Sequence, residues 1–118
     1  MAADRRFVEA LWIGLMLLLT ALTAYIHYWV GGWLLIINAA GYAGLIVLVL
    51  GSWALYRRAL PVVLGLLAAY AGATIAGWVV MGPYFDVAYL AKGIELLLIA
   101  TIALWLRFHA AETRDALR

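Results

Sequence analysis

The sequence predicts an all-α membrane protein, a four-transmembrane-helix bundle whose helices run up, down, up and down. Three observations predict this fold: 69% of the 118 residues are hydrophobic, only 12% are charged, and the apolar residues fall into four long stretches. A soluble domain is nearer half apolar and a quarter charged. Because the apolar runs are continuous and do not alternate in polarity, a β-barrel is excluded.

Each stretch is long enough to cross a bilayer, since a helix needs about 20 apolar residues to span a hydrocarbon core of about 30 Å. The connections between them are only a few residues long, so consecutive helices are expected to be antiparallel neighbours in a single integral membrane domain, 1–118. The expected spans are residues 7–30, 33–56, 60–81 and 87–108, and a short tail follows at 109–118.

Residues that favour turns or helix ends mark the boundaries between the expected helices. Gly31 and Gly32 supply the backbone freedom for a tight reversal after the first span. Pro61 suits the first turn of the third helix. The glycine–proline pair that begins at Gly82 stops that helix, and Asp86 is expected to cap the fourth. We expect the first span to be retained and not cleaved as a signal peptide.

The basic residues predict the orientation. Seven of the eight lie at one end of the expected helices, the eighth is inside the fourth span, and the connections at the other end carry none. By the positive-inside rule, both termini are therefore expected in the cytoplasm. Trp12, Trp53 and Trp105, near the inner ends, are expected as interface anchors. The seven basic residues are Arg5, Arg6, Arg57, Arg58, Arg107, Arg114 and Arg118.

Charged residues inside a span are the strongest functional signal, because each costs a few kcal/mol on insertion scales. Lys92 and Glu95 are three residues apart and are therefore expected to pair. Glu95 lies about 12 Å below the outer end of its helix, too deep for its short side chain to reach the interface. Near the inner end of the first span, Glu9 is expected to be neutralised by Arg5 or Arg6.

Other polar and aromatic residues lie at a similar depth in the outer half. If their faces turn inward, they form either a polar network that only fixes helix register or an outward-facing pocket for a small polar or amphipathic ligand. Proton coupling through Glu95 or His27 is a third interpretation. The candidate residues are His27, Asn38, Tyr42, Thr74, Trp78, Asp86, Tyr89, Lys92 and Glu95.

Several chemistries find no support in the sequence. Without cysteine there is no disulfide, thiol nucleophile or iron–sulfur cluster. His27 and His109 are expected at opposite membrane faces, so neither a haem nor another metal site is expected. Ser52 is the only serine and lies far from His27, which leaves no catalytic set. No cofactor is expected, and no basic run indicates nucleic acid as a partner.

The third span carries small residues at intervals of four, Gly65, Ala69, Ala73 and Gly77. Such a ridge lets another helix backbone approach closely. Packing of the second span against the third is the simpler interpretation. An interface with a second copy of the chain or with another membrane subunit is the alternative.

Two segments carry a family resemblance. One contains His27, Gly31-Gly32, the letters LLIIN and Gly41-Tyr42, and the other ends in Lys92-Gly-Ile-Glu95. Over residues 25–105 the chain resembles uncharacterised small four-helix bacterial membrane proteins with a His…GG…LLN-x-x-GY segment and a late Lys-x-x-Glu helix. The resemblance implies a four-span protein of the bacterial inner (plasma) membrane and implies no activity.

Length and span count also match the small multidrug-resistance transporters and the dimeric fluoride channels. Glu9 is not at mid-membrane as the transporters require, and the phenylalanine- and threonine-rich motifs of the channels are missing, so neither family is assigned. Two functions are expected. The first is a non-catalytic protein that acts by association in the bilayer, as an accessory subunit or small binding module of a membrane complex. The alternative is a homo-oligomeric transporter of a small solute, ion or proton that uses the outer pocket.

Overall fold

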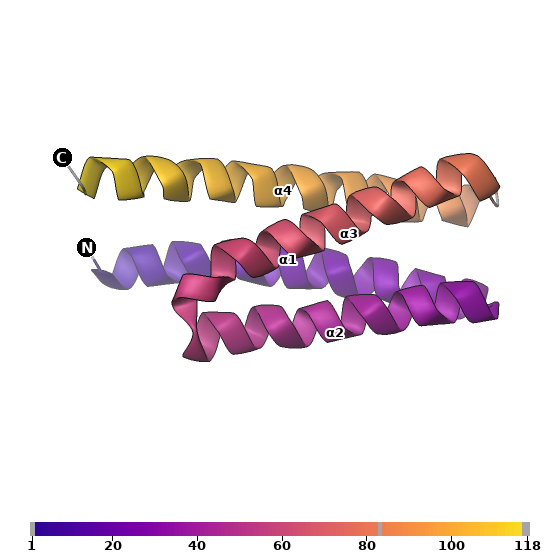
Figure 1. Ribbon diagram of the computed structural model, residues 1–118, viewed down its shortest axis with the longest axis horizontal. Helices are drawn as coiled ribbons and strands as arrows, with labels where there is room; N and C mark the ends of the chain where they lie inside the picture. The colour runs from indigo at the N-terminus through magenta and orange to yellow at the C-terminus, as the bar shows by residue number, and fades with distance from the viewer. Residues whose placement is uncertain (1, 83, 117–118) are drawn as a thin grey trace.

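The computed structural model describes residues 2–82 and 84–116, and within them it is helical without a strand (Figure 1). All four long helices are apolar enough to cross a membrane, so the chain is a multi-pass membrane protein. The helices at the two ends of the chain continue beyond the expected spans. The elements are α1 (Ala2–Val30), α2 (Trp33–Leu55), the short 3₁₀ turn η1 (Arg57–Ala59), α3 (Leu60–Met81) and α4 (Asp86–Ala116).

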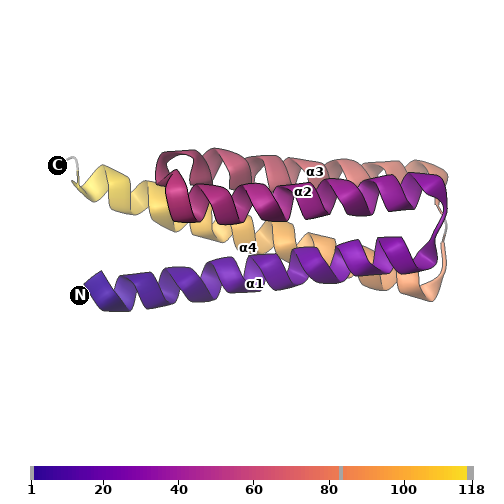
Figure 2. The same ribbon diagram turned by 90° about the horizontal axis from the view of Figure 1, so that it is seen from below.

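The four helices form a ring in which each packs against two neighbours. Helix α1 contacts α2 and α4, and α3 contacts the same two helices. The bundle is elongated, with dimensions of 49 × 23 × 20 Å. Both termini lie at one end, which we call the proximal end (Figures 1 and 2). The distal end contains the α1–α2 and α3–α4 connections.

Glycine conformation explains both distal connections. Gly31 and Gly32 have φ angles of 85° and 88°, and Gly82 has a φ angle of 72°. A residue with a Cβ atom rarely adopts such angles, so the predicted reversals at these glycines are confirmed. At the proximal connection, Pro61 lies in the first turn of α3, where its missing N–H costs no helical hydrogen bond.

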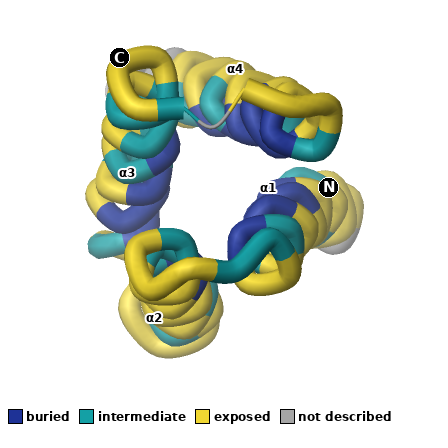
Figure 3. The backbone as a smooth tube through the Cα atoms, turned by 90° about the vertical axis from the view of Figure 1, so that its right-hand side faces the viewer, coloured by how far each residue is buried: buried dark blue, intermediate teal, exposed yellow. Residues whose placement is uncertain are grey.

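The outside of the bundle is apolar, unlike the outside of a water-soluble bundle. Buried stretches face the centre of the ring (Figure 3), and they include several polar residues. Large apolar side chains cover the outside, which is the surface that lipid accepts and water does not. The buried polar residues include Thr20, Thr23, His27, Ser52, Lys92, Glu95 and Thr101, and the exposed apolar ones include Leu11, Leu18, Ile37, Val47, Leu48, Val62, Leu66, Leu96 and Leu97.

The proximal half has an apolar core. Leu98, Ile102 and Trp105 follow one another at spacings of four and three, so they lie on one face of α4 and are buried together. The Trp105 ring is only 8% exposed and stacks on the His109 ring at a centroid distance of 4.8 Å. The expectation that Trp105 anchors the interface is therefore wrong, because its helical position turns it into the bundle.

The proximal end also contains an ion pair between α1 and the turn before α3. Trp53 Nε1 donates to Glu9 Oε1 at 2.9 Å, and Arg57 Nη2 donates to both carboxylate oxygens at 2.5 Å. The expected neutralisation of Glu9 by Arg5 or Arg6 is wrong. Folding brings Arg57 to Glu9 across 48 positions of sequence, whereas the nearby arginines lie on the exposed side of α1.

The small residues of the α3 ridge are loosely packed in this chain. Ala69 and Ala73 are exposed, and a Cβ atom added at Gly65 or Gly77 would meet no atom within 4 Å. Helix α3 buries Ala71 instead, which is two residues, about 200°, around the helix from Ala69. Helices α2 and α3 pack against each other, but without a close contact at Gly65 or Gly77. Ala73 and Gly77 instead line a cavity in the distal half.

Candidate functional site

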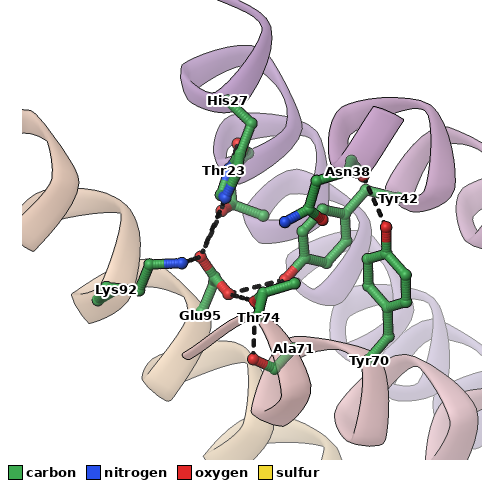
Figure 4. Close-up of polar contacts among 9 residues, drawn as sticks. All are labelled: Thr23, His27, Asn38, Tyr42, Tyr70, Ala71, Thr74, Lys92 and Glu95. Carbon is green, nitrogen blue, oxygen red and sulfur yellow. Dashed lines mark hydrogen bonds and ion pairs between the residues drawn. The ribbon is translucent and has the colours of Figure 1, made fainter. Parts of the chain in front are cut away.

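The centre of the distal half is a single carboxylate. Glu95 on α4 is fully buried, and its two oxygens accept hydrogen bonds from side chains of all four helices (Figure 4). Each helix contributes one donor to it. The donors are Thr23 on α1, Tyr42 on α2, Thr74 on α3 and Lys92 on α4.

The two oxygens of Glu95 have different partners. Oε1 accepts from Lys92 Nζ at 2.8 Å and from Thr23 Oγ1 at 3.2 Å. Oε2 accepts from the Tyr42 hydroxyl at 2.8 Å and from Thr74 Oγ1. The predicted pairing of Lys92 with Glu95 is thus confirmed. Charge-assisted bonds of this kind are the strong ones, and they compensate the burial of the carboxylate.

The Thr74 hydroxyl lies within hydrogen-bond distance of more than one acceptor. It also lies 2.8 Å from the Ala71 carbonyl oxygen and 3.1 Å from the Tyr42 hydroxyl. A threonine hydroxyl carries one proton, so it donates either to Glu95 or to its own helix. The Thr74 proton therefore has two acceptors within reach, Glu95 Oε2 and the Ala71 carbonyl oxygen.

His27 is the second titratable group beside the carboxylate. Its Nδ1 lies 2.7 Å from the Thr23 carbonyl oxygen, which can only accept, so Nδ1 carries a proton. Its Nε2 lies 3.7 Å from Glu95 Oε1, too far for a hydrogen bond. A proton on Nε2 would make this contact an ion pair.

Two tyrosines and an asparagine surround this centre. The Tyr70 hydroxyl donates to the Asn38 backbone oxygen at 2.9 Å, and the Tyr70 ring meets the Tyr42 ring edge-on at a centroid distance of 4.8 Å. Within the described residues, the side-chain oxygen of Asn38 is buried without a hydrogen-bond partner. A buried acceptor left unpaired costs about 1–3 kcal/mol, so this oxygen favours a ligand or water that can donate to it.

A cavity of about 330 Å³ lies next to the network and is open to the surface. His27, Thr74 and Lys92 line it, whereas Glu95 lies behind them. The rest of the wall is mainly apolar and comes from every helix. It includes Ile26, Val30, Leu34, Trp78, Met81, Phe85 and Ala88.

The structure brings together most of the candidate residues. His27, Tyr42, Thr74, Lys92 and Glu95 form the hydrogen-bonded cluster, and Asn38 and Trp78 line the cavity. Asp86 and Tyr89 do not join them. Both are exposed at the distal end of α4, where the Tyr89 ring lies against the Trp78 ring at 5.2 Å.

Sequence reasoning missed two residues of the site, Thr23 and Tyr70. Each lies four positions before a residue that was singled out, Thr23 before His27 and Tyr70 before Thr74. Side chains four apart share a helix face. Extending each candidate by one helical turn would therefore have found both.

The site combines an ion pair, a histidine and three hydroxyl groups, which suits binding of a polar group or a proton. Among the described residues, no group of three His, Asp or Glu side chains is arranged to hold a metal ion. A comparison with protein-family models, with curated proteins and with solved structures finds no match to this chain.

Proposed function

We propose that the protein binds a small amphipathic molecule in the distal cavity, as a transporter or solute-binding membrane protein does. The observation that carries the proposal is an open, mostly apolar cavity whose polar side includes His27, Thr74 and Lys92, backed by the buried Glu95. Ligand sites generally combine apolar walls with a few convergent polar groups.

A network that only fixed helix register would have no need of this cavity. Helices in lipid associate by close packing and by hydrogen bonds, and both favour closing the space between them. Here the space stays open beside the costliest residues of the chain, and Asn38 is one of its lining residues. A bound molecule with an apolar body and a polar group would suit both the apolar walls and these polar residues.

The absence of cysteine makes a direct test possible. Ala88 lines the cavity, whereas Ala71 is fully buried in the core and does not line it. We expect a water-soluble thiol reagent to label Ala88→Cys and to leave Ala71→Cys unlabelled. Equal labelling of the two variants, or no labelling of Ala88→Cys, would contradict the proposed binding function.

We further propose that the helices run up, down, up and down across a bacterial inner membrane, with both termini in the cytoplasm and the cavity facing outward. The support is the gathering of Arg5, Arg6, Arg57, Arg58 and Arg107 at the proximal end. An impermeant thiol reagent applied to intact cells should then label Ala88→Cys. Labelling of Ala88→Cys only after the cells are opened would mean that the cavity faces the cytoplasm.

A second candidate function is association with another membrane protein, as an accessory subunit or in a homo-oligomer. The observation that favours it is the proximal part of the small-residue ridge, where Ala69 is exposed and a Cβ atom added at Gly65 would meet no atom within 4 Å. After extraction in mild detergent, Ala69→Leu should reduce the size of the particle. Ala100→Leu, at an exposed alanine of α4, is the matched control. If the unaltered protein is already a monomer after extraction, association as the function is contradicted.

A further inference from the structure

We propose that the ligand of the distal cavity is a small amphipathic anion, such as an aromatic carboxylate, and that it binds together with one proton on His27. This inference rests on the proposed binding function and names its ligand class. It follows from three features of the polar side of the cavity: unused donors, an empty proton position and the balance of charge.

The unused donors belong to Lys92. An ammonium group has three N–H donors. Within the described part of the chain Lys92 Nζ makes one hydrogen bond, to Glu95 Oε1. Lys92 lines the cavity, so its remaining donors are available to a molecule bound there. A carboxylate is the group that best uses several N–H donors from a cation.

The proton position is Nε2 of His27. Because Nδ1 donates to the Thr23 carbonyl oxygen, the neutral ring presents a lone pair at Nε2 to Glu95 Oε1, 3.7 Å away. Two acceptors cannot bond each other. A proton bound at Nε2 would lie between the ring and the carboxylate, at the edge of the cavity that His27 lines.

The balance of charge links the proton to the anion. The groups that face His27 from the helices packed against α1 are Tyr42 on α2 and Lys92 and Glu95 on α4, and Tyr70 on α3 lines the same cavity. With neutral tyrosines and a neutral histidine, the ion pair leaves the site with no net charge. An anion alone would add an uncompensated charge in a medium of low dielectric constant, which is strongly unfavourable. A proton on His27 restores neutrality.

The walls limit the size of the anion. A cavity of about 330 Å³ is at the lower end of the range for ligand sites, and Trp78 and Phe85 give it aromatic sides. These dimensions suit a compact organic acid. A molecular cation is disfavoured, because its charge would face the Lys92 ammonium.

Three molecules with the same aromatic ring test the ligand class: phenylacetate, 2-phenylethanol and phenethylamine. Each is titrated by calorimetry into the full chain in lipid nanodiscs, and empty nanodiscs are the blank. We expect phenylacetate to bind most tightly and to take up one proton from the buffer. Its affinity should fall by about tenfold per pH unit on the alkaline side of the His27 titration. Proton uptake is measured with the unaltered protein in buffers of different ionisation enthalpy.

His27→Gln separates two routes for the proton, since glutamine keeps a hydrogen-bonding side chain but cannot bind a proton at this pH. If His27 holds the proton, the variant should bind phenylacetate more weakly and without proton uptake. Uptake that persists in a variant with unchanged helicity would mean that the proton is held by the ligand itself or by Glu95, which overturns the role of His27. Absence of uptake by the unaltered protein overturns it without any variant.

The remaining outcomes concern the ligand class. Tighter binding of phenethylamine or 2-phenylethanol would overturn the anion assignment and leave the proposed binding function intact. Binding of none of the three would also overturn this inference. In that case, labelling of Ala88→Cys still decides separately whether the cavity is open to solutes.

Discussion

At the residue scale, Glu95 connects the whole distal half of the molecule. It is fully buried, and four donors from four helices share its two oxygens. A buried carboxylate without such partners would be far too costly to keep ionised. The partners also depend on it, because loss of the acceptor leaves a buried ammonium and three hydroxyl groups to find other bonds.

We expect Glu95→Gln to destabilise the bundle strongly. The amide cannot neutralise Lys92, and removing one partner of a buried ion pair typically costs about 3–5 kcal/mol. The double variant Lys92→Met with Glu95→Gln should recover most of this loss, because no unpaired charge remains. The free energy of unfolding in mixed micelles, followed by helicity, measures both. Equal stability of the single and double variants would mean that the pair is not coupled.

Some of this cluster could be predicted from sequence. Lys92 and Glu95 stand out because charges are rare in a span and because three positions separate them. Thr23 does not stand out, since a threonine hydroxyl in a helix often bonds its own backbone. Its hydrogen bond to Glu95 joins residues 72 positions apart, and no local pattern encodes that distance.

At the element scale, one close approach sets the spacing of α2 and α3. A Cβ atom added at Gly41 would lie 2.0 Å from the Tyr70 hydroxyl oxygen and 2.6 Å from its Cζ. The same hydroxyl donates to the Asn38 carbonyl oxygen, one turn earlier on α2. The tyrosine thus lies against the glycine and joins the two helices where they border the cavity.

Gly41→Ala should push the Tyr70 ring away from α2 and break its hydrogen bond to Asn38, with a loss of stability of about 1 kcal/mol. Gly44→Ala is the matched control on the same helix, because a Cβ atom there meets nothing within 4 Å. Thermal unfolding of the two variants in the same detergent makes the comparison. If Gly44→Ala were as destabilising as Gly41→Ala, the contact with Tyr70 would not be the cause.

The existence of the four helices could be predicted, whereas the way they face one another could not. Long apolar runs are visible in the sequence, and so are Gly31, Gly32 and Gly82, whose positive φ angles the structure shows. The rotation of a helix inside lipid is less visible, because α3 is apolar on every side. A ridge of small residues therefore suggested a close contact with α2, whereas the fully buried residues Leu67 and Ala71 lie on another face of α3.

At the scale of the whole molecule, two clusters that each contain an ion pair connect the helices, one in each half of the bundle. Glu95 belongs to the distal cluster, and Glu9 belongs to the proximal one with Arg57 and Trp53. They differ in exposure: the side chains of Glu95 and Glu9 are 0% and 19% exposed, and that of Arg57 is 57% exposed. Water screens the proximal pair and leaves the distal one unscreened.

Glu9→Gln should therefore cost much less than Glu95→Gln, about 1 kcal/mol or below, because exposed ion pairs contribute little. Raising the salt concentration should weaken the proximal pair and leave the distal one unchanged. Unfolding free energies of both variants at low and high salt measure this difference. A larger loss for Glu9→Gln would place the main electrostatic stabilisation at the proximal end.

The link of four helices to one carboxylate also bears on how the chain is made. Synthesis starts at the N-terminus, so Thr23, Tyr42 and Thr74 leave the ribosome before their common acceptor. Until then the Thr74 hydroxyl can bond the Ala71 carbonyl oxygen of its own helix. Glu95 then arrives beside Lys92, which offsets the carboxylate's charge as α4 enters the membrane. Helix α4 thus supplies the acceptor that joins the three helices before it, and a chain interrupted before α4 would contain the three hydroxyl donors without their acceptor.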